Sequence, residues 1–314
     1  MSTRISAESY THLLSPAYRE FIQTVNSLMP EDFGSLSIAA QRTAYNHMLQ
    51  QLGNQLPTHL LIEDQQLKTP KHPIPIRSYQ VPQPSAAMQI IYFHGGGFVL
   101  GDLNSHHGIC ADLCAGTGLS IMAVDYRLAP EQLFPVALED AVLAYQTLAA
   151  QTDSALIVMG DSAGGCLAAH VAHQLRGQAK APSAQLLIYP VLGSDFSLDS
   201  YERYALAPLL TTEDMQFYWQ AWLGKQMVPN CLKGIPLATD DFSDLPNTVI
   251  FSAEYDPLVG EAELYCQRIK AGGGQATWYH EPGLTHGYLH ARQRLDSARS
   301  SFMRIQQVLK DLSA

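Results

Sequence analysis

Apolar residues follow a helical spacing in the first part of the chain. The stretch "SPAYREFIQTVNSLM" predicts an amphipathic helix, because its larger side chains recur every three to four positions. The apolar face of that helix is formed by Tyr18, Phe21, Ile22, Val25 and Met29. A second helical stretch runs from Ile38 to Leu52, and Gly53 ends it.

The spacing changes after residue 55. "HLLIEDQQL" (59–67) and "IPIRSYQVP" (74–82) alternate apolar and polar residues, and prolines lie near their ends, so we predict two antiparallel edge strands. From residue 88 onward, short apolar runs alternate with helical stretches. Strands are predicted at 88–93, 120–125, 155–159, 185–189, 248–253 and 276–280, and helices at 105–116, 136–150, 163–177, 212–223, 260–271 and 296–312. This alternation is typical of an α/β fold with a mostly parallel central sheet and helices on both faces.

One long connection interrupts the alternation. Residues 192–245 hold only one or two predicted helices between consecutive strands, and loops of that length in a compact domain are usually lids or binding elements. The segment is rich in aromatic side chains: Phe196, Tyr201, Tyr204, Phe217, Tyr218, Trp219 and Trp222. We expect 1–55 and 192–245 to form a small helical cap over a catalytic domain made of 56–191 and 246–314.

Composition and charge narrow the classes of function. The chain has 314 residues and a formal net charge of −10, which argues against binding to nucleic acids or to anionic membranes. The N-terminus lacks the apolar core of a secretory signal, and no uninterrupted apolar run approaches the ~18 residues of a membrane span. The five cysteines form no C-x-x-C pair, which favours reduced thiols and a cytoplasmic protein.

A candidate nucleophile follows the predicted strand "ALIVM". The next residues, "GDSAGG" (160–165), place Ser162 in a G-x-S-x-G pattern between a strand and a helix. A sharp turn there needs small residues two positions before and after the serine, and Gly160 and Gly164 provide them. The turn would expose the serine hydroxyl and point the backbone N–H of Ala163 at the same spot.

A serine hydroxyl needs a base to remove its proton, and the base needs an acid to fix its tautomer. Asp256 follows the strand in "TVIFSAEYDPL", and His286 lies in the glycine-containing loop of "TWYHEPGLTHGY". Active sites of open α/β sheets collect at the carboxyl ends of the strands, so we expect these side chains to meet Ser162 there. The side chains that compete for these roles are Glu254 and Glu261 for the acid, and His280 and His290 for the base.

The glycines in "IIYFHGGGFVLGDL" suggest an anion-binding loop. Gly95, Gly96 and Gly97 come directly after a buried strand and His94. Attack on an ester turns the carbonyl oxygen into an anion, which preorganised N–H donors stabilise. Glycine N–H groups from this loop, opposite that of Ala163, could provide such an oxyanion hole. His94 is expected to brace its own loop.

Five motifs stand together in one order: "HGGG" (94–97), "DYRLAPE" (125–131), "GDSAGG" (160–165), "DPL" (256–258) and "HGY" (286–288). With them the chain resembles the hormone-sensitive-lipase-like family of α/β hydrolases, the bacterial family IV carboxylesterases, over roughly residues 55–314. The resemblance implies an α/β-hydrolase fold and the roles of nucleophile for Ser162, acid for Asp256 and base for His286. It also implies that Gly96 and Gly97 act with Ala163 as oxyanion donors. One departure is "DPLVGE", where Gly260 replaces an acidic residue that the family often has.

The sequence therefore predicts a serine carboxylesterase that hydrolyses small, short-chain acyl esters through an acyl-enzyme, without a metal or organic cofactor. His170 and His173 form an H-x-x-H pair, but the other ligands of a metal site are missing around it. An amidase or a carbohydrate O-deacetylase would use the same residues, and a ligand-binding protein on a hydrolase scaffold is a further alternative. Related folds often form homodimers through their last strand, and nothing in the sequence decides this.

Overall fold

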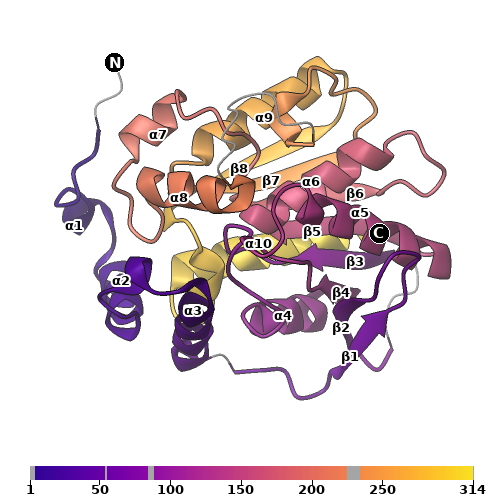
Figure 1. Ribbon diagram of the computed structural model, residues 1–314, viewed down its shortest axis with the longest axis horizontal. Helices are drawn as coiled ribbons and strands as arrows, with labels where there is room; N and C mark the ends of the chain where they lie inside the picture. The colour runs from indigo at the N-terminus through magenta and orange to yellow at the C-terminus, as the bar shows by residue number, and fades with distance from the viewer. Residues whose placement is uncertain (1–3, 54, 84–87, 225–233, 314) are drawn as a thin grey trace.

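An eight-stranded sheet forms the centre of the molecule (Figure 1). The computed structural model describes residues 4–53, 55–83, 88–224 and 234–313. The strand order is β1-β2-β4-β3-β5-β6-β7-β8. The strands are β1 (Leu61–Leu67), β2 (Ile74–Gln80), β3 (Met88–Phe93), β4 (Ser120–Val124), β5 (Ala155–Asp161), β6 (Ala184–Ile188), β7 (Asn247–Tyr255) and β8 (Ala276–Thr285).

The sheet is mostly parallel, as predicted, with antiparallel pairing only between β1 and β2 and between β2 and β4. The prediction that both early strands are edge strands was half wrong. β1 is an edge strand, but β2 lies inside the sheet, because it pairs with β1 on one side and with β4 on the other. β5 extends beyond its predicted end, because Gly160 and Asp161 still pair with β6.

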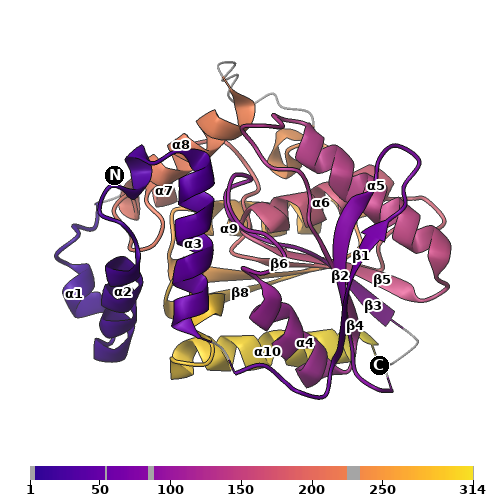
Figure 2. The same cartoon turned by 60° about the horizontal axis from the view of Figure 1, so that its bottom comes forward.

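Helices cover both faces of the sheet (Figure 2). Side chains alternate along the strands: in β3, Ile91 and Phe93 join the core under one set of helices, and Ile90 and Tyr92 join the core on the other face. The first face carries α5 (Val136–Gln151), α6 (Ala163–Leu175) and α9 (Val259–Ala271), and the second carries α4 (His107–Thr117) and α10 (Asp296–Ser313). None of the helices in the described residues is long and apolar enough to cross a membrane.

The remaining helices gather on one side of the molecule in both views (Figures 1 and 2). They are α1 (Tyr10–Leu13), α2 (Pro16–Leu28), α3 (Ile38–Leu52), α7 (Asp199–Arg203) and α8 (Thr212–Leu223), with short 3-10 turns at Phe33–Ser35, Pro236–Ala238 and Tyr288–Ala291. A capping box between Thr211 and Asp214 starts α8, and Gly224 ends it. We call 4–53 and the described parts of 192–245 the cap segments; their assignment as a separate cap stays a prediction.

Candidate active site

The turn between β5 and α6 holds Ser162 in an unusual backbone conformation. Its φ of 54° and ψ of −120° are rare for a residue with a side chain, and such strain is typical of functional positions. Hydrogen bonds hold the turn: the Ser162 N–H donates to the carbonyl of Ile188 at 2.9 Å, and the Ser162 carbonyl accepts from Val191 at 3.1 Å. The strand, turn and helix therefore have the arrangement that the G-x-S-x-G pattern predicts.

Two glycines permit this turn because the backbones approach closely. A methyl group on Gly160 would overlap the backbone of Gly164, and one on Gly164 would overlap the carbonyl of Phe93. Both positions therefore require glycine for a packing reason. The same closeness brings the start of α6 against the end of β3, where the loop with the glycine run begins.

The structure brings Ser162, His286 and Asp256 together in one hydrogen-bonded chain. His286 Nε2 lies 2.9 Å from Ser162 Oγ, and His286 Nδ1 lies 2.7 Å from Asp256 Oδ2. Asp256 is fully buried, and its other oxygen accepts from the backbone N–H of Leu258 at 2.9 Å. With a proton on Nδ1 donated to the carboxylate, Nε2 has a free lone pair for the serine proton.

The competing acids are engaged elsewhere. Glu254 accepts a hydrogen bond from the backbone N–H of Gly283 at 2.7 Å. Glu261 is buried and accepts from the N–H groups of Leu192 and Gly193 and from the Tyr201 hydroxyl. Burial raises the pKa of Glu261 to about 7, although these three hydrogen bonds act to lower it.

The competing histidines make other contacts. His280 is in β8, where its ring lies beside that of Trp278. His290 contacts His106 edge to face, and burial, followed by the nearby His106, lowers the pKa of His290 to about 3. Of the histidines considered, His286 is the one that bridges Ser162 and an aspartate.

The glycine loop follows β3 and lies beside Ser162. The N–H groups of Gly96, Gly97 and Ala163 have no hydrogen-bond partner among the residues that the structure describes. The Gly95 N–H, in contrast, donates to Asp161 Oδ1 at 3.0 Å. The bond to Asp161 engages the Gly95 N–H, which leaves Gly96 and Gly97, the two glycines that the resemblance singles out, as the candidate donors of this loop. His94 braces the loop as expected: its Nδ1 lies 2.8 Å from the Gly95 carbonyl, and its ring stacks on Tyr126.

Asp161 is a buried residue of the site that the sequence analysis did not single out. It accepts hydrogen bonds from the Tyr92 hydroxyl at 2.7 Å and from Gly95, and His106 Nε2 lies 3.2 Å from its other oxygen. Burial by itself would raise the pKa of Asp161, but His106 and the Tyr92 hydroxyl hold that pKa well below its usual range. An acidic residue between a buried strand and the serine in "GDSAGG" was the signal that could have revealed it.

A cavity of about 340 Å³ opens over Ser162 and His286. Its walls come from both cap segments and are mainly apolar. The apolar side chains of α2, α3 and the turn between them that line it are Phe21, Val25, Met29, Phe33, Met48, Leu49 and Leu52. Leu209, Leu210 and Tyr218 contribute from the other cap segment, and Tyr45 and Asn26 add polar atoms. A small, largely apolar molecule would fit beside the serine hydroxyl.

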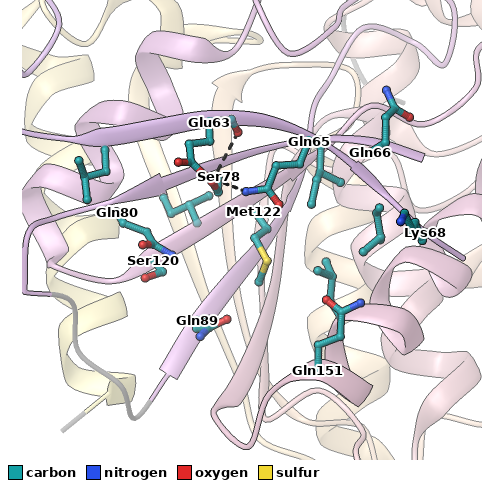
Figure 3. Close-up of a pocket in the computed structure, with 15 residues that line it drawn as sticks. Glu63, Gln65, Gln66, Lys68, Ser78, Gln80, Gln89, Ser120, Met122 and Gln151 are labelled. Atoms are coloured by element: carbon teal, nitrogen blue, oxygen red, sulfur yellow. Dashed lines mark hydrogen bonds between the residues drawn. The ribbon is translucent and has the colours of Figure 1, made fainter. Parts of the chain in front are cut away.

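A second cavity, of about 390 Å³, lies between β1, β2, β4 and α5 (Figure 3). Its lining mixes apolar side chains with several glutamines and serines, and no histidine or cysteine is among the described residues that line it. Ser78 Oγ lies 3.4 Å from the backbone carbonyl of Glu63 instead of facing a base. This cavity therefore lacks the nucleophile and base that the first one contains.

Comparisons with known proteins show which family the chain belongs to. Residues 90–290 match a family described as having the alpha/beta hydrolase fold. The chain is 35% identical to the esterase LipI of Mycobacterium tuberculosis, over 81% of this chain and 83% of that protein. It is 31% identical to the ethyl acetate hydrolase of Pseudomonas putida, over 76% of this chain and 79% of that protein.

A solved structure shares the architecture along almost the whole chain. The hyperthermophilic esterase from the archaeon Pyrobaculum calidifontis superimposes with a TM-score of 0.85 and 31% identity, covering 96% of this chain and 99% of that one. The eight-stranded sheet, the order of the motifs and these similarities lead to the same result. The chain belongs to the α/β-hydrolase family, in its hormone-sensitive-lipase-like branch of esterases and lipases.

Proposed function

We propose that this protein is a serine carboxylesterase that hydrolyses short-chain acyl esters. The observation that carries the proposal is the hydrogen-bonded chain from Ser162 through His286 to Asp256, at 2.9 Å and 2.7 Å. A hydroxyl, an imidazole and a buried carboxylate in this order are the groups that acyl transfer requires. The esterases among its relatives support the same class of reaction.

In the proposed first step, Ser162 Oγ attacks the ester carbonyl while His286 Nε2 takes the hydroxyl proton. Asp256 holds the resulting imidazolium through its bond to Nδ1. The carbonyl oxygen becomes an anion, and the free N–H groups of Gly96, Gly97 and Ala163 are the proposed donors that stabilise it. When the tetrahedral intermediate collapses, the C–O bond to the alcohol breaks, and His286 gives its proton to the leaving alkoxide.

The second step repeats this chemistry with water. His286 takes a proton from a water molecule, whose oxygen attacks the acyl carbon bound to Ser162. The second tetrahedral intermediate places its anion at the same donors. Collapse breaks the acyl–Oγ bond, His286 returns the proton to Ser162, and the carboxylic acid leaves. These steps use no metal and no organic cofactor.

The cavity supports a small ester as the substrate. It has a volume of about 340 Å³ and mainly apolar walls, which suits an acyl chain of a few carbons and a small alcohol. An amide or a sugar acetate could present the same carbonyl to Ser162, so the leaving group needs a direct test. The cytoplasmic location and the homodimer stay predictions.

The test is a panel of p-nitrophenyl esters of increasing acyl length, together with an anilide and an acetylated sugar. We expect the protein to hydrolyse the short esters and Ser162→Ala to lose that activity while keeping its fold. Preferential hydrolysis of the anilide or the sugar acetate would instead favour an amidase or an O-deacetylase. Activity that survives Ser162→Ala in protein free of contaminating esterases would contradict the proposal.

A further inference from the structure

We infer that helix α8 positions the oxyanion loop, residues 95–100, so that this cap segment supports the chemical step as well as enclosing the substrate. The inference rests on the proposed function, since it concerns the donors Gly96 and Gly97. It assigns Trp222 and Tyr218 as positioning residues. Neither belongs to the hydrogen-bonded chain of Ser162, His286 and Asp256.

The first contact is a stack between Trp222 and Phe98. The two ring centroids lie 3.6 Å apart, with 9° between the ring planes, and both side chains are buried. Phe98 has a φ of 63°, which is unfavourable for a residue with a side chain. Such a conformation persists only where its surroundings hold it, and the stack on Trp222 is a contact of this kind.

Other contacts anchor both partners of this stack. Trp222 also meets Phe134 edge to face at 5.2 Å, and the Trp222 carbonyl accepts from the Phe134 N–H at 2.9 Å. The Phe98 carbonyl accepts from the N–H of Ala129 at 2.9 Å. The end of α8 and the loop are thus fixed to the same segment, residues 129–134.

The second contact is between the ring of Tyr218 and Gly97. A methyl group on Gly97 would overlap that ring, so the ring lies directly on the glycine. Gly97 also has a φ of 62°, in the left-handed region that favours glycine. Tyr218 therefore covers the backbone of a proposed oxyanion donor from the cavity side, and its position limits where that donor can move.

A third contact comes from the other cap segment. Arg42 of α3 donates from Nε to the carbonyl of Val99 at 2.8 Å and from Nη2 to the carbonyl of Ala129 at 2.8 Å. Glu131 holds the same guanidinium through two hydrogen bonds. The loop is therefore contacted by both cap segments, and Arg42 joins it to the segment that also anchors Trp222.

These contacts have a consequence for catalysis. Oxyanion donors lower the barrier because they are already in place when the charge develops, and a loop that can move loses part of this advantage. Loosening the loop should therefore weaken binding of the transition state more than binding of the ester. Such a loss appears in kcat, with little change in KM.

The experiment compares Trp222→Leu with Trp222→Phe, which keeps an aromatic ring for the stack. The matched control is Phe242→Leu, which removes a buried aromatic ring in the same cap segment that packs on Tyr265. We expect Trp222→Leu to lose about 10- to 100-fold in kcat with KM within about threefold, since removal of a whole donor costs about 10²–10³. Trp222→Phe should stay within about fivefold of the wild type, and Phe242→Leu should keep its kcat.

A trifluoromethyl ketone provides a readout that a loss of stability would not change. Its carbonyl forms an oxyanion adduct with a serine, so its affinity should fall in Trp222→Leu in parallel with kcat/KM. Thermal unfolding monitors the fold of each variant. If Trp222→Leu does not fold, the same assays apply to Tyr218→Leu, with Tyr218→Phe as its conservative partner.

The two ideas fail in different ways. A wild-type protein without esterase activity would overturn the proposed function. The positioning role alone would be overturned if the wild type is active and folded Trp222→Leu keeps its kcat and its affinity for the ketone. The same holds for folded Tyr218→Leu where that pair of variants is used. Equal losses of kcat in Trp222→Leu and in Phe242→Leu would also overturn the positioning role, because they would indicate a general effect of destabilisation.

Discussion

Asp161 Oδ1 accepts a hydrogen bond from the backbone N–H of Gly95 at 3.0 Å. This bond joins the residue directly before the proposed nucleophile to the first glycine of the oxyanion loop. The same carboxylate accepts from the Tyr92 hydroxyl, and the Tyr189 hydroxyl lies 3.4 Å from its second oxygen. The ring centroids of Tyr189 and His286 lie 4.6 Å apart, so Asp161 is linked to the oxyanion loop directly and to His286 through Tyr189.

Asp161→Asn should therefore reduce kcat by about 10-fold or more. The bonds from Gly95 and Tyr92 both end on Oδ1, and an asparagine oxygen can keep them. Its NH2 group would replace Oδ2, however, so the negative charge and the acceptor beside His106 Nε2 and the Tyr189 hydroxyl are lost, and Tyr189 contacts His286. The measurement is kcat and KM on a short p-nitrophenyl ester, with thermal unfolding as a check on the fold. Asp153→Asn is the control, since Asp153 is fully exposed just before β5. Equal kcat in Asp161→Asn and Asp153→Asn would remove Asp161 from the site.

Ser162→Ala should lose about 10⁴- to 10⁶-fold in kcat, as removal of a nucleophile does in other hydrolases. The hydroxyl bonds only to His286 among the described residues, so the fold should remain. A burst titration with an active-site phosphonate gives the fraction of labelled protein, and the variant should take up no label. Stoichiometric labelling of the variant would place the nucleophile elsewhere.

Asp256→Asn should lose about 10⁴-fold in kcat while the protein stays folded. The amide would present an N–H to His286 Nδ1 and favour the tautomer that places a proton on Nε2, where the serine proton has to go. Glu254→Gln is the comparison, since Glu254 was a competing acid and accepts from the Gly283 N–H. A larger loss in Glu254→Gln than in Asp256→Asn would mean that the wrong acid was chosen.

Much of this site could be predicted from the sequence because its residues lie at strand ends. Ser162, Asp256 and His286 each follow or end a parallel strand, and parallel strands bring their carboxyl ends to one edge. The cavity wall was harder to predict. The aromatic residues of α8 have a helical spacing that fits both a core and a binding surface, and only the fold places Tyr218 on Gly97 and Trp222 on Phe98.

Two features of the structure could not be predicted from local patterns, for the same physical reason. The role of Gly95 depends on a buried aspartate that lies 66 positions later in the chain, which no local pattern reveals. The position of β2 inside the sheet depends on its pairing with β4, whereas its prolines and alternation are equally typical of an edge strand. Long-range pairing decided both outcomes.

Glu261→Gln should change the pH dependence of stability. The pKa of Glu261 is raised from its ordinary 4.5 to about 7 in the folded protein, so the folded state binds the proton more tightly than the unfolded state. The stabilisation that comes from this tighter proton binding by Glu261 is fully present below about pH 4.5, and it is lost as the pH rises through about 7. The stability of the wild type relative to Glu261→Gln should fall across this range, by up to about 3 kcal/mol.

Denaturant unfolding at several pH values measures this difference. Glu263→Gln is the control, because Glu263 lies on the same helix and is exposed. Its stability should follow that of the wild type at each pH. If the difference in the free energy of unfolding between the wild type and Glu261→Gln stays constant from pH 4.5 to 8, the pKa of Glu261 does not change on folding.

Acyl chain length should have a maximum at roughly two to six carbons, because side chains of both cap segments form the walls of the cavity. Each methylene that fits adds at most about 0.8 kcal/mol of burial, and one that does not fit costs a similar amount in strain. Met48 lines the cavity, so Met48→Ala should move the maximum of kcat/KM to longer chains. Leu13→Ala should leave it unchanged, since Leu13 is exposed on α1 and is not among the lining residues. Soluble esters of increasing length and one emulsified long-chain triglyceride provide the measurement. A maximum at about ten carbons or more, or a jump in rate at the oil–water interface, would show that this cavity does not set the limit.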